Sequence, residues 1–133
     1  MDSTALAKEP FVSLTTFRRD GTPVSVPVWC AADNGMLVVF SEADSWKVKR
    51  IRHDPHVRLA PCSARGKPRA PVVDADASLV EETTKVEGLL ARKYGWAWRG
   101  YRALMLLTAV VRRLRRQIPA AWLTIRITLR EGW

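Results

Sequence analysis

Apolar and polar side chains alternate over short stretches of this chain, a pattern that predicts β-strands. The stretches are rich in β-branched and aromatic residues, and turn-forming residues separate most of them. The predicted strands cover residues 11–18, 24–31, 36–40, 56–62, 69–80 and 122–130. Pro27 lies inside the second stretch and cannot donate to a ladder of hydrogen bonds. We therefore expect an edge, a bulge or a ligand-facing surface at that strand.

Tight turns and a short helix connect the first strands. Asp20-Gly21 predicts a hairpin turn, because glycine tolerates a positive φ, and residues 33–35 (DNG) predict another. After residue 40 the chain enters a short helix, for which Asp44 or Ser45 is the predicted N-cap. Pro55 ends this helix, because the residue before a proline is disfavoured in the helical region.

Helices precede the final strand. Residues 83–94 predict one helix with Gly95 just after its end, and residues 101–117 predict a second. Trp96 and Trp98 lie in the predicted connection between them. The second helix has an apolar stripe at packing spacing, formed by Leu104, Leu107, Val111, Leu114 and Ile118.

The order of these elements predicts an α+β fold that is mainly β. Antiparallel strands joined by short turns favour a closed or nearly closed barrel. We expect about six strands, a short helix after the third strand, and helices near the C-terminus. The 133 residues fit a single domain, residues 1–133, which is large enough to bury a core without disulfides or metals.

The chain is strongly basic, with a formal net charge of +9. This surplus indicates an acidic partner: nucleic acid, an anionic membrane or a polyanionic small molecule. Cys30 and Cys62 lie in strand-like runs and are expected to be buried thiols. His53 and His56 have no third ligand in register, so no metal site is predicted. Residues 1–9 are polar and contain no apolar leader, which makes the cytoplasm the expected location.

The start of the short helix is the first candidate site. Unpaired backbone amides and the helix dipole favour an anion at this position. Ser41 and Ser45 add hydroxyl groups, and Lys47 adds a full positive charge in the first turn. The combination predicts a phosphate site, although an ordinary capped surface helix with solvated lysines would have the same pattern.

The helix predicted over residues 101–117 is the second candidate. Its stripe is accompanied by a basic cluster, Arg112, Arg113, Arg115 and Arg116. Packing in the core or in a dimer is the first expectation, and contact with a membrane surface is the second. Nucleic-acid binding ranks last, because no base-stacking strand motif is present. The apolar run of residues 103–111 is too short to span a bilayer, which takes about 20 residues.

Three segments carry a resemblance to a known family: residues 11–29 (FVSLTTFRRDGTPVSVPVW), 40–59 (FSEADSWKVKRIRHDPHVRL) and 60–67 (APCSARGK). In order and spacing they resemble the pyridoxamine-phosphate-oxidase-like split β-barrel family, specifically its flavin- and deazaflavin-dependent oxidoreductase branch. The C-terminal half matches only loosely, and residues 101–117 look like an extra or lengthened helix. The resemblance implies a split barrel that a second chain completes, and hence a homodimer.

The resemblance also implies which residues bind the cofactor. Its Ser-x-Lys element would bind a phosphate through Ser45 and Lys47, with Ser41 as a further ligand. The tricyclic ring would lie against the backbone of Val26, Pro27, Val28 and Trp29. Relatives that use FMN carry an arginine just before the lysine, where this chain has Trp46. Loss of that bidentate phosphate donor favours the deazaflavin coenzyme F420, whose poly-glutamate tail would suit a basic chain.

The implied function is an F420-dependent oxidoreductase that transfers a hydride between the deazaflavin ring and an unsaturated or carbonyl small-molecule substrate. The ring carries the chemistry, so no catalytic side chain is assigned. Two alternatives stay open. One is an FMN-dependent oxidoreductase of the same fold, and the other is a non-catalytic protein that binds a cofactor or a tetrapyrrole such as haem.

Overall fold

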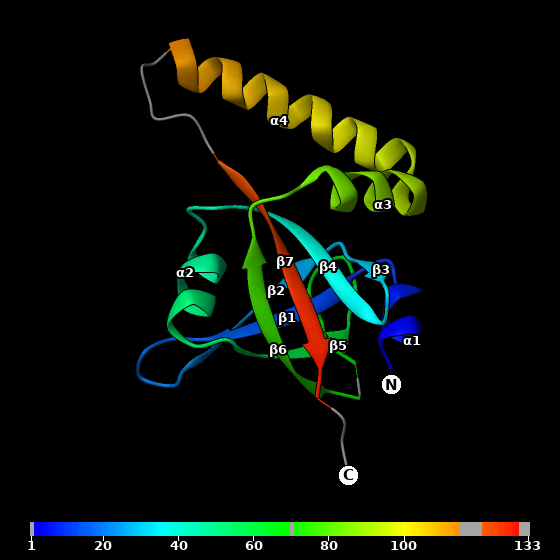
Figure 1. Ribbon diagram of the computed structural model, residues 1–133, viewed down its shortest axis with the longest axis vertical. Helices are drawn as coiled ribbons and strands as arrows, with labels where there is room; N and C mark the ends of the chain where they lie inside the picture. Colours follow the sequence, from blue (N-terminus) through cyan, green and yellow to red (C-terminus); the bar gives the residue numbers. More distant parts are fainter. Residues whose placement is uncertain (1, 70, 115–120, 131–133) are drawn as a thin grey trace.

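The computed structural model describes residues 2–69, 71–114 and 121–130. Seven antiparallel strands form one sheet that curls into a half-barrel, with α3 and α4 across one end (Figure 1). The strand order is β2-β1-β5-β6-β7-β4-β3. In chain order the elements are α1 Ser3–Ala7, β1 Val12–Phe17, β2 Pro23–Val28, β3 Ala31–Asp33, β4 Met36–Glu42, α2 Trp46–His53, β5 His56–Pro61, β6 Val73–Val80, α3 Thr84–Tyr94, α4 Trp96–Leu114 and β7 Trp122–Leu129.

The structure confirms the α+β fold and corrects two strands. Residues 24–31, predicted as one strand, belong to β2 and β3, which lie at opposite edges of the sheet. The division falls at Trp29-Cys30, because α3 supplies the hydrogen bonds there. The Cys30 amide donates to the Tyr94 hydroxyl at 3.2 Å, and Lys93 Nζ donates to the Cys30 carbonyl at 2.7 Å. Strand β6 begins at residue 73 and not at 69, since Pro71 has no amide hydrogen to donate to a ladder.

The predicted turns and the edge strand are confirmed. Gly21 has a φ of 88° in the β1–β2 hairpin, where the Thr22 amide donates to the Asp20 carboxylate at 2.9 Å. Asn34 and Gly35, with φ values of 50° and 81°, form the β3–β4 turn. Strand β2 pairs with β1 alone and is an edge of the sheet, which explains how Pro27 is tolerated within it.

Two apolar clusters hold the fold together. The larger one fills the half-barrel, where Leu14, Leu59 and Ile125 are almost completely buried. Each such side chain stabilises the fold by about 1.5–3 kcal/mol. The smaller cluster packs the sheet against α3 and α4 and contains Ala31, Val38, Phe40, Val86, Leu90, Trp98 and Met105. Cys30 and Cys62 are buried free thiols, as the sequence predicted.

The short helix α2 begins where the sequence placed it. Of the two predicted N-caps, Ser45 is the one used, and its side chain accepts a hydrogen bond from the Val48 amide at 3.4 Å. Val48 and Ile51 face the core. The helix ends at His53, just before Asp54-Pro55, as predicted.

Helix α4 differs from its prediction in its start and in its packing. It begins at Trp96 and not at residue 101, so the connection from α3 is the single residue Gly95, with a φ of 55°. The expected core packing of its apolar stripe is wrong for this chain: Leu107 is 61% exposed and Leu114 is 80% exposed. The predicted end of the helix, with Arg115, Arg116 and Ile118, lies outside the described residues.

Candidate functional site

A cavity of about 240 Å³ lies where β2, β4, α2, α3 and α4 approach one another. Most of its wall is apolar, with one ammonium group and one phenol hydroxyl among the described side chains. The lining residues are Phe11, Pro27, Val28, Trp29, Val39, Phe40, Lys47, Leu90, Trp98 and Tyr101. Such a cavity suits a ligand with a flat apolar part and an anionic part.

Aromatic side chains from several elements hold one wall of this cavity in place. Trp29 stacks on Tyr94, with ring centroids 4.6 Å apart. Phe40 stacks on Trp122 at 4.9 Å and meets the edge of Trp98 at 5.5 Å. The Tyr94 hydroxyl donates to the Pro10 carbonyl at 2.9 Å, which fixes its ring as well. Because the rings support one another, the wall is formed before a ligand binds.

The start of α2 joins the end of β4 beside this cavity. Ser41 is almost fully buried near the end of β4, and its hydroxyl lies 3.2 Å from the Ser45 hydroxyl. Ser45 in turn caps α2 through the Val48 amide. The first-turn amides of a helix have no acceptor within the helix, so this corner carries the positive end of the helix dipole. The two serines predicted for the phosphate site are therefore in contact.

Lys47 is the charged group of the cavity. Its side chain is half-buried, and this desolvation lowers the pKa of its ammonium group. The carboxylate of Glu42 opposes the shift, while the charge of Arg50 adds to it. Because the pKa of Lys47 is lowered on balance, the groups around its ammonium do not fully replace the water that burial removes. An anion in the cavity would favour the charged form of this lysine.

Tyr101 contributes the hydroxyl of the cavity wall from the first turns of α4. Burial raises the pKa of this phenol, and the nearby Glu42 carboxylate raises it further. Tyr101 therefore keeps its proton at neutral pH and is available as a hydrogen-bond donor to a ligand in the cavity.

The predicted site residues fall into three groups. Four line the cavity together: Pro27, Val28, Trp29 and Lys47. Ser41 and Ser45 contact each other at the adjoining helix start. Val26 and Trp46 lie elsewhere. Val26 packs against the core of the half-barrel, and Trp46 is 71% exposed, with Lys49 Nζ 4.5 Å from the centre of its ring.

Sequence reasoning missed the part of the wall that α3 and α4 supply. The sequence predicts Trp98 in a connection and Tyr101 at the start of a separate helix, whereas both belong to the first turns of α4. Their spacing with Met105, at i, i+3 and i+7, was a signal for one continuous helix face. Leu90, Phe11 and the aromatic packing depend on tertiary contacts that no local pattern contains.

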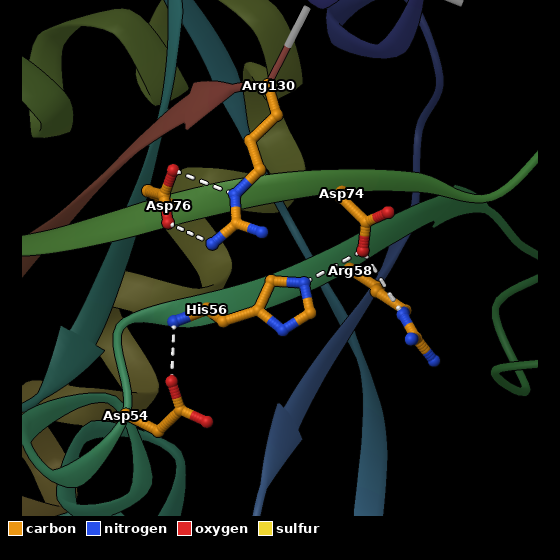
Figure 2. A network of polar contacts seen from close by, with 6 residues as sticks. All are labelled: Asp54, His56, Arg58, Asp74, Asp76 and Arg130. Carbon is orange, nitrogen blue, oxygen red and sulfur yellow. Dashed lines mark hydrogen bonds and ion pairs between the residues drawn. The ribbon is translucent and has the colours of Figure 1, made fainter. Parts of the chain in front are cut away.

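A second group of charged side chains lies on the strands β5 and β6 and just after the end of β7 (Figure 2). His56 Nε2 lies 2.8 Å from the Asp74 carboxylate, which also accepts from Arg58 at 3.2 Å. Arg130 donates to both carboxylate oxygens of Asp76, at 3.0 and 2.8 Å. Among the described residues no cluster of His, Cys, Asp or Glu has the composition of a metal site. Asp74 and Asp76 are thus each paired with an arginine at the sheet surface.

The curled antiparallel sheet, with a cavity at the start of the helix after β4, is a split barrel. The sequence profile of the family described as pyridoxamine 5'-phosphate oxidase matches residues 3–129. The chain therefore belongs to that family. No match was found among curated proteins.

Solved structures with the same fold have diverse descriptions. HutZ, the heme storage protein from Vibrio cholerae, has a TM-score of 0.65 at 14% identity, covering 97% of this chain and 88% of its own. Conserved hypothetical protein Rv2991 from Mycobacterium tuberculosis has a TM-score of 0.63 at 19% identity, and the match covers 98% of this chain and 82% of the Rv2991 chain. A protein described as an F420 reductase has a TM-score of 0.59 at 18% identity, and the match covers 96% of this chain and 92% of the reductase chain. At these identities the likeness shows the fold alone.

Proposed function

We propose that the protein is an oxidoreductase that binds coenzyme F420 in the cavity between β2 and α4. One observation carries the proposal: Lys47, at the start of α2, lines the same cavity as Pro27, Val28 and Trp29. A partly desolvated cation thus stands next to an apolar, aromatic wall. This arrangement suits a cofactor that joins a flat ring system to a phosphate.

The residues of the cavity have separate roles in this proposal. Lys47 and the first-turn amides of α2 hold the phosphate, and Ser41 and Ser45 set the geometry of that corner. The backbone from Pro27 to Trp29 lies along the ring. When bound, F420 supplies two-electron hydride chemistry toward an unsaturated or carbonyl substrate. Tyr101 donates a hydrogen bond that helps to orient one of the bound molecules.

The choice of F420 over FMN rests on Trp46. The indole is largely exposed and does not line the cavity, and it has no bidentate donor to offer a phosphate. Haem is disfavoured by the lining. The described cavity-lining residues include no His, Cys or Met, the side chains that most often ligate haem iron.

We also propose that the active form is a homodimer, in which a second chain closes the open side of the cavity. The partly exposed Tyr101 and the exposed Pro27 at this site support the proposal. Light scattering at micromolar concentration with the cofactor present is expected to give twice the mass of the chain. A monomer under these conditions would contradict this part of the proposal.

Equilibrium fluorescence titrations with F420 and FMN test the cofactor assignment. We expect a lower dissociation constant for F420 than for FMN. Tighter binding of FMN would refute the assignment, and a strong Soret band on addition of hemin, with no deazaflavin binding, would indicate a tetrapyrrole carrier. Turnover of reduced F420 with a panel of enones and quinones then separates an enzyme from a cofactor carrier.

A further inference from the structure

The outer face of α4 is apolar and has no partner within the described part of the chain. Its exposed side chains are Leu104 (57%), Leu106 (60%), Leu107 (61%), Val110 (54%), Val111 (40%) and Leu114 (80%). Successive members lie one to three residues apart, so they form one broad stripe along the helix. A contiguous apolar surface of this kind on a single chain marks a site of interaction.

The stripe faces away from the half-barrel. Trp98 and Met105 are buried and attach the first turns of α4 to the sheet, and Arg102 pairs with Glu87 of α3 at 3.0 Å. At 100° per residue, the stripe is centred on the side of the helix opposite Trp98 and Met105. Figure 1 shows α4 at one extreme of the long axis of the molecule, beyond all other elements. A flat surface can therefore contact the stripe without meeting the barrel.

The charge of α4 indicates what that surface is. The helix contains four arginines, Arg99, Arg102, Arg112 and Arg113, and no Asp or Glu. The sequence continues with two more arginines, and the whole chain has a net charge of +9. An apolar stripe on an acid-free basic helix is complementary to the anionic headgroups and acyl chains of a lipid bilayer.

We propose that α4 binds the surface of an anionic lipid bilayer, lying in the plane of the interface with its leucine stripe inserted. Among the described residues no helix is long and apolar enough to cross a membrane, so the contact is peripheral. A second copy of the chain suits the stripe less well. Two α4 helices would carry eight arginines between them and no carboxylate of their own, so no ion pair between the two helices would offset the repulsion of like charges.

This proposal is independent of the proposed cofactor and reverses the order of partners expected from the sequence. The sequence placed core or dimer packing before lipid, because the leucine spacing is that of a packed helix. The structure leaves the stripe exposed, which removes core packing within this chain from the alternatives.

Co-sedimentation of the purified full-length protein with vesicles tests the proposal. At 0.15 M salt we expect strong binding to phosphatidylcholine vesicles that contain about 30% phosphatidylglycerol, and weak binding to pure phosphatidylcholine. A Leu107→Gln/Leu114→Gln double variant should bind at least about tenfold more weakly. Val72→Gln is the matched control, since Val72 is 61% exposed outside α4 and its change should leave binding intact.

A second measurement reports the position of the helix directly. An environment-sensitive fluorophore on Leu107→Cys should shift to the blue with anionic vesicles, and the same label on Val72→Cys should not. The native thiols, Cys30 and Cys62, are buried and should label poorly. Arg112→Gln/Arg113→Gln should weaken binding by about fivefold per arginine near the surface.

Three results would overturn the proposal. The first is no binding of the wild-type chain to anionic vesicles. The second is vesicle binding that the Leu107 and Leu114 changes leave unaltered. The third is a lipid-free dimer that these changes convert to a monomer, combined with no fluorophore shift on vesicles, which would make a second copy the occupant of the stripe.

Discussion

The polar group on β5 and β6 and the cavity beside α2 differ in how their charges are balanced. In the group around Asp74 and Asp76 each carboxylate pairs with a cation, and the groups remain open to water (Figure 2). In the cavity, Lys47 stands among aromatic side chains, and the cost of its desolvation outweighs the attraction of Glu42. The comparison separates surface carboxylates that are held by neighbouring cations from a cation that is set into an apolar wall, which is the group that the proposed cofactor would contact.

The two regions should also differ in what stabilises them. Exposed ion pairs contribute little to stability, because water and salt screen them and long side chains lose freedom. The cavity wall is instead built from buried rings that contact one another. Substitutions in the two regions can therefore be compared for stability and for ligand binding separately.

The largest effect is expected for Trp98→Ala in the aromatic wall. Trp98 is 5% exposed and contacts Phe40 and Tyr101. Its removal should lower the free energy of unfolding by about 3–5 kcal/mol, measured by urea denaturation. Trp96→Ala, two residues earlier on the same helix, is the control, because Trp96 is 86% exposed. Equal losses for the two variants would show that Trp98 does not anchor α4.

Lys47→Ala should lower the affinity for F420 by about tenfold to a hundredfold, or about 1.5–3 kcal/mol, as expected for loss of a charge-assisted hydrogen bond. The fold should persist, because a lysine in the first turn of a helix gains nothing from the dipole. The difference should shrink as salt rises.

Lys49→Ala is the matched control for this change. Lys49 is exposed and lies over the ring of Trp46, outside the cavity. If both substitutions weaken binding equally in fluorescence titrations, the chain attracts the cofactor through its overall positive charge. The prediction of a specific phosphate site at Ser45 and Lys47 would then be wrong.

Glu42→Gln should raise the affinity for F420 by about threefold to tenfold, since the carboxylate that competes for Lys47 and repels a phosphate is removed. Glu81→Gln, on the exposed loop between β6 and α3, makes the same change of charge away from the cavity and should have little effect. Weaker binding by the Glu42 variant would mean that this carboxylate positions Lys47 and does not compete for it.

The smallest effect is expected for Asp74→Asn in the balanced group. Hydrogen bonds from His56 and then from Arg58 hold the pKa of Asp74 below its ordinary value. A carboxylate with a lowered folded-state pKa stabilises the fold above the unfolded pKa, near 4, and loses this contribution as the pH falls through the folded pKa. The melting temperatures of wild type and variant, measured by thermal denaturation, should thus differ slightly at pH 7 and become equal in acid. A large difference at pH 7 would contradict a merely structural surface role.

Local patterns predicted most of the strands, an N-cap at Asp44 or Ser45 and the basic start of α2, because these depend on neighbouring residues. They missed the division at Trp29-Cys30, because the groups that satisfy Cys30 come from Lys93 and Tyr94, more than 60 residues away. The cavity was half predicted for the same reason. Pro27 and Lys47 follow from motifs, whereas Trp98 joins them only through tertiary packing. The spacing of apolar residues over 101–117 predicted the apolar stripe of α4, but it did not determine which surface contacts that stripe.

The division between β2 and β3 has a mechanical consequence. These strands are the two outer edges of the sheet, yet only Trp29 and Cys30 separate them along the chain. The two edge strands are thus joined by the chain itself and not by a ladder of hydrogen bonds. A change in the distance between them requires rotation about a few backbone torsions at Trp29 and Cys30, and no ladder has to break. Lys93 and Tyr94 of α3 bond to the same two-residue link, so a tilt of α3 would move Trp29 and Cys30 and, with them, the adjoining ends of β2 and β3.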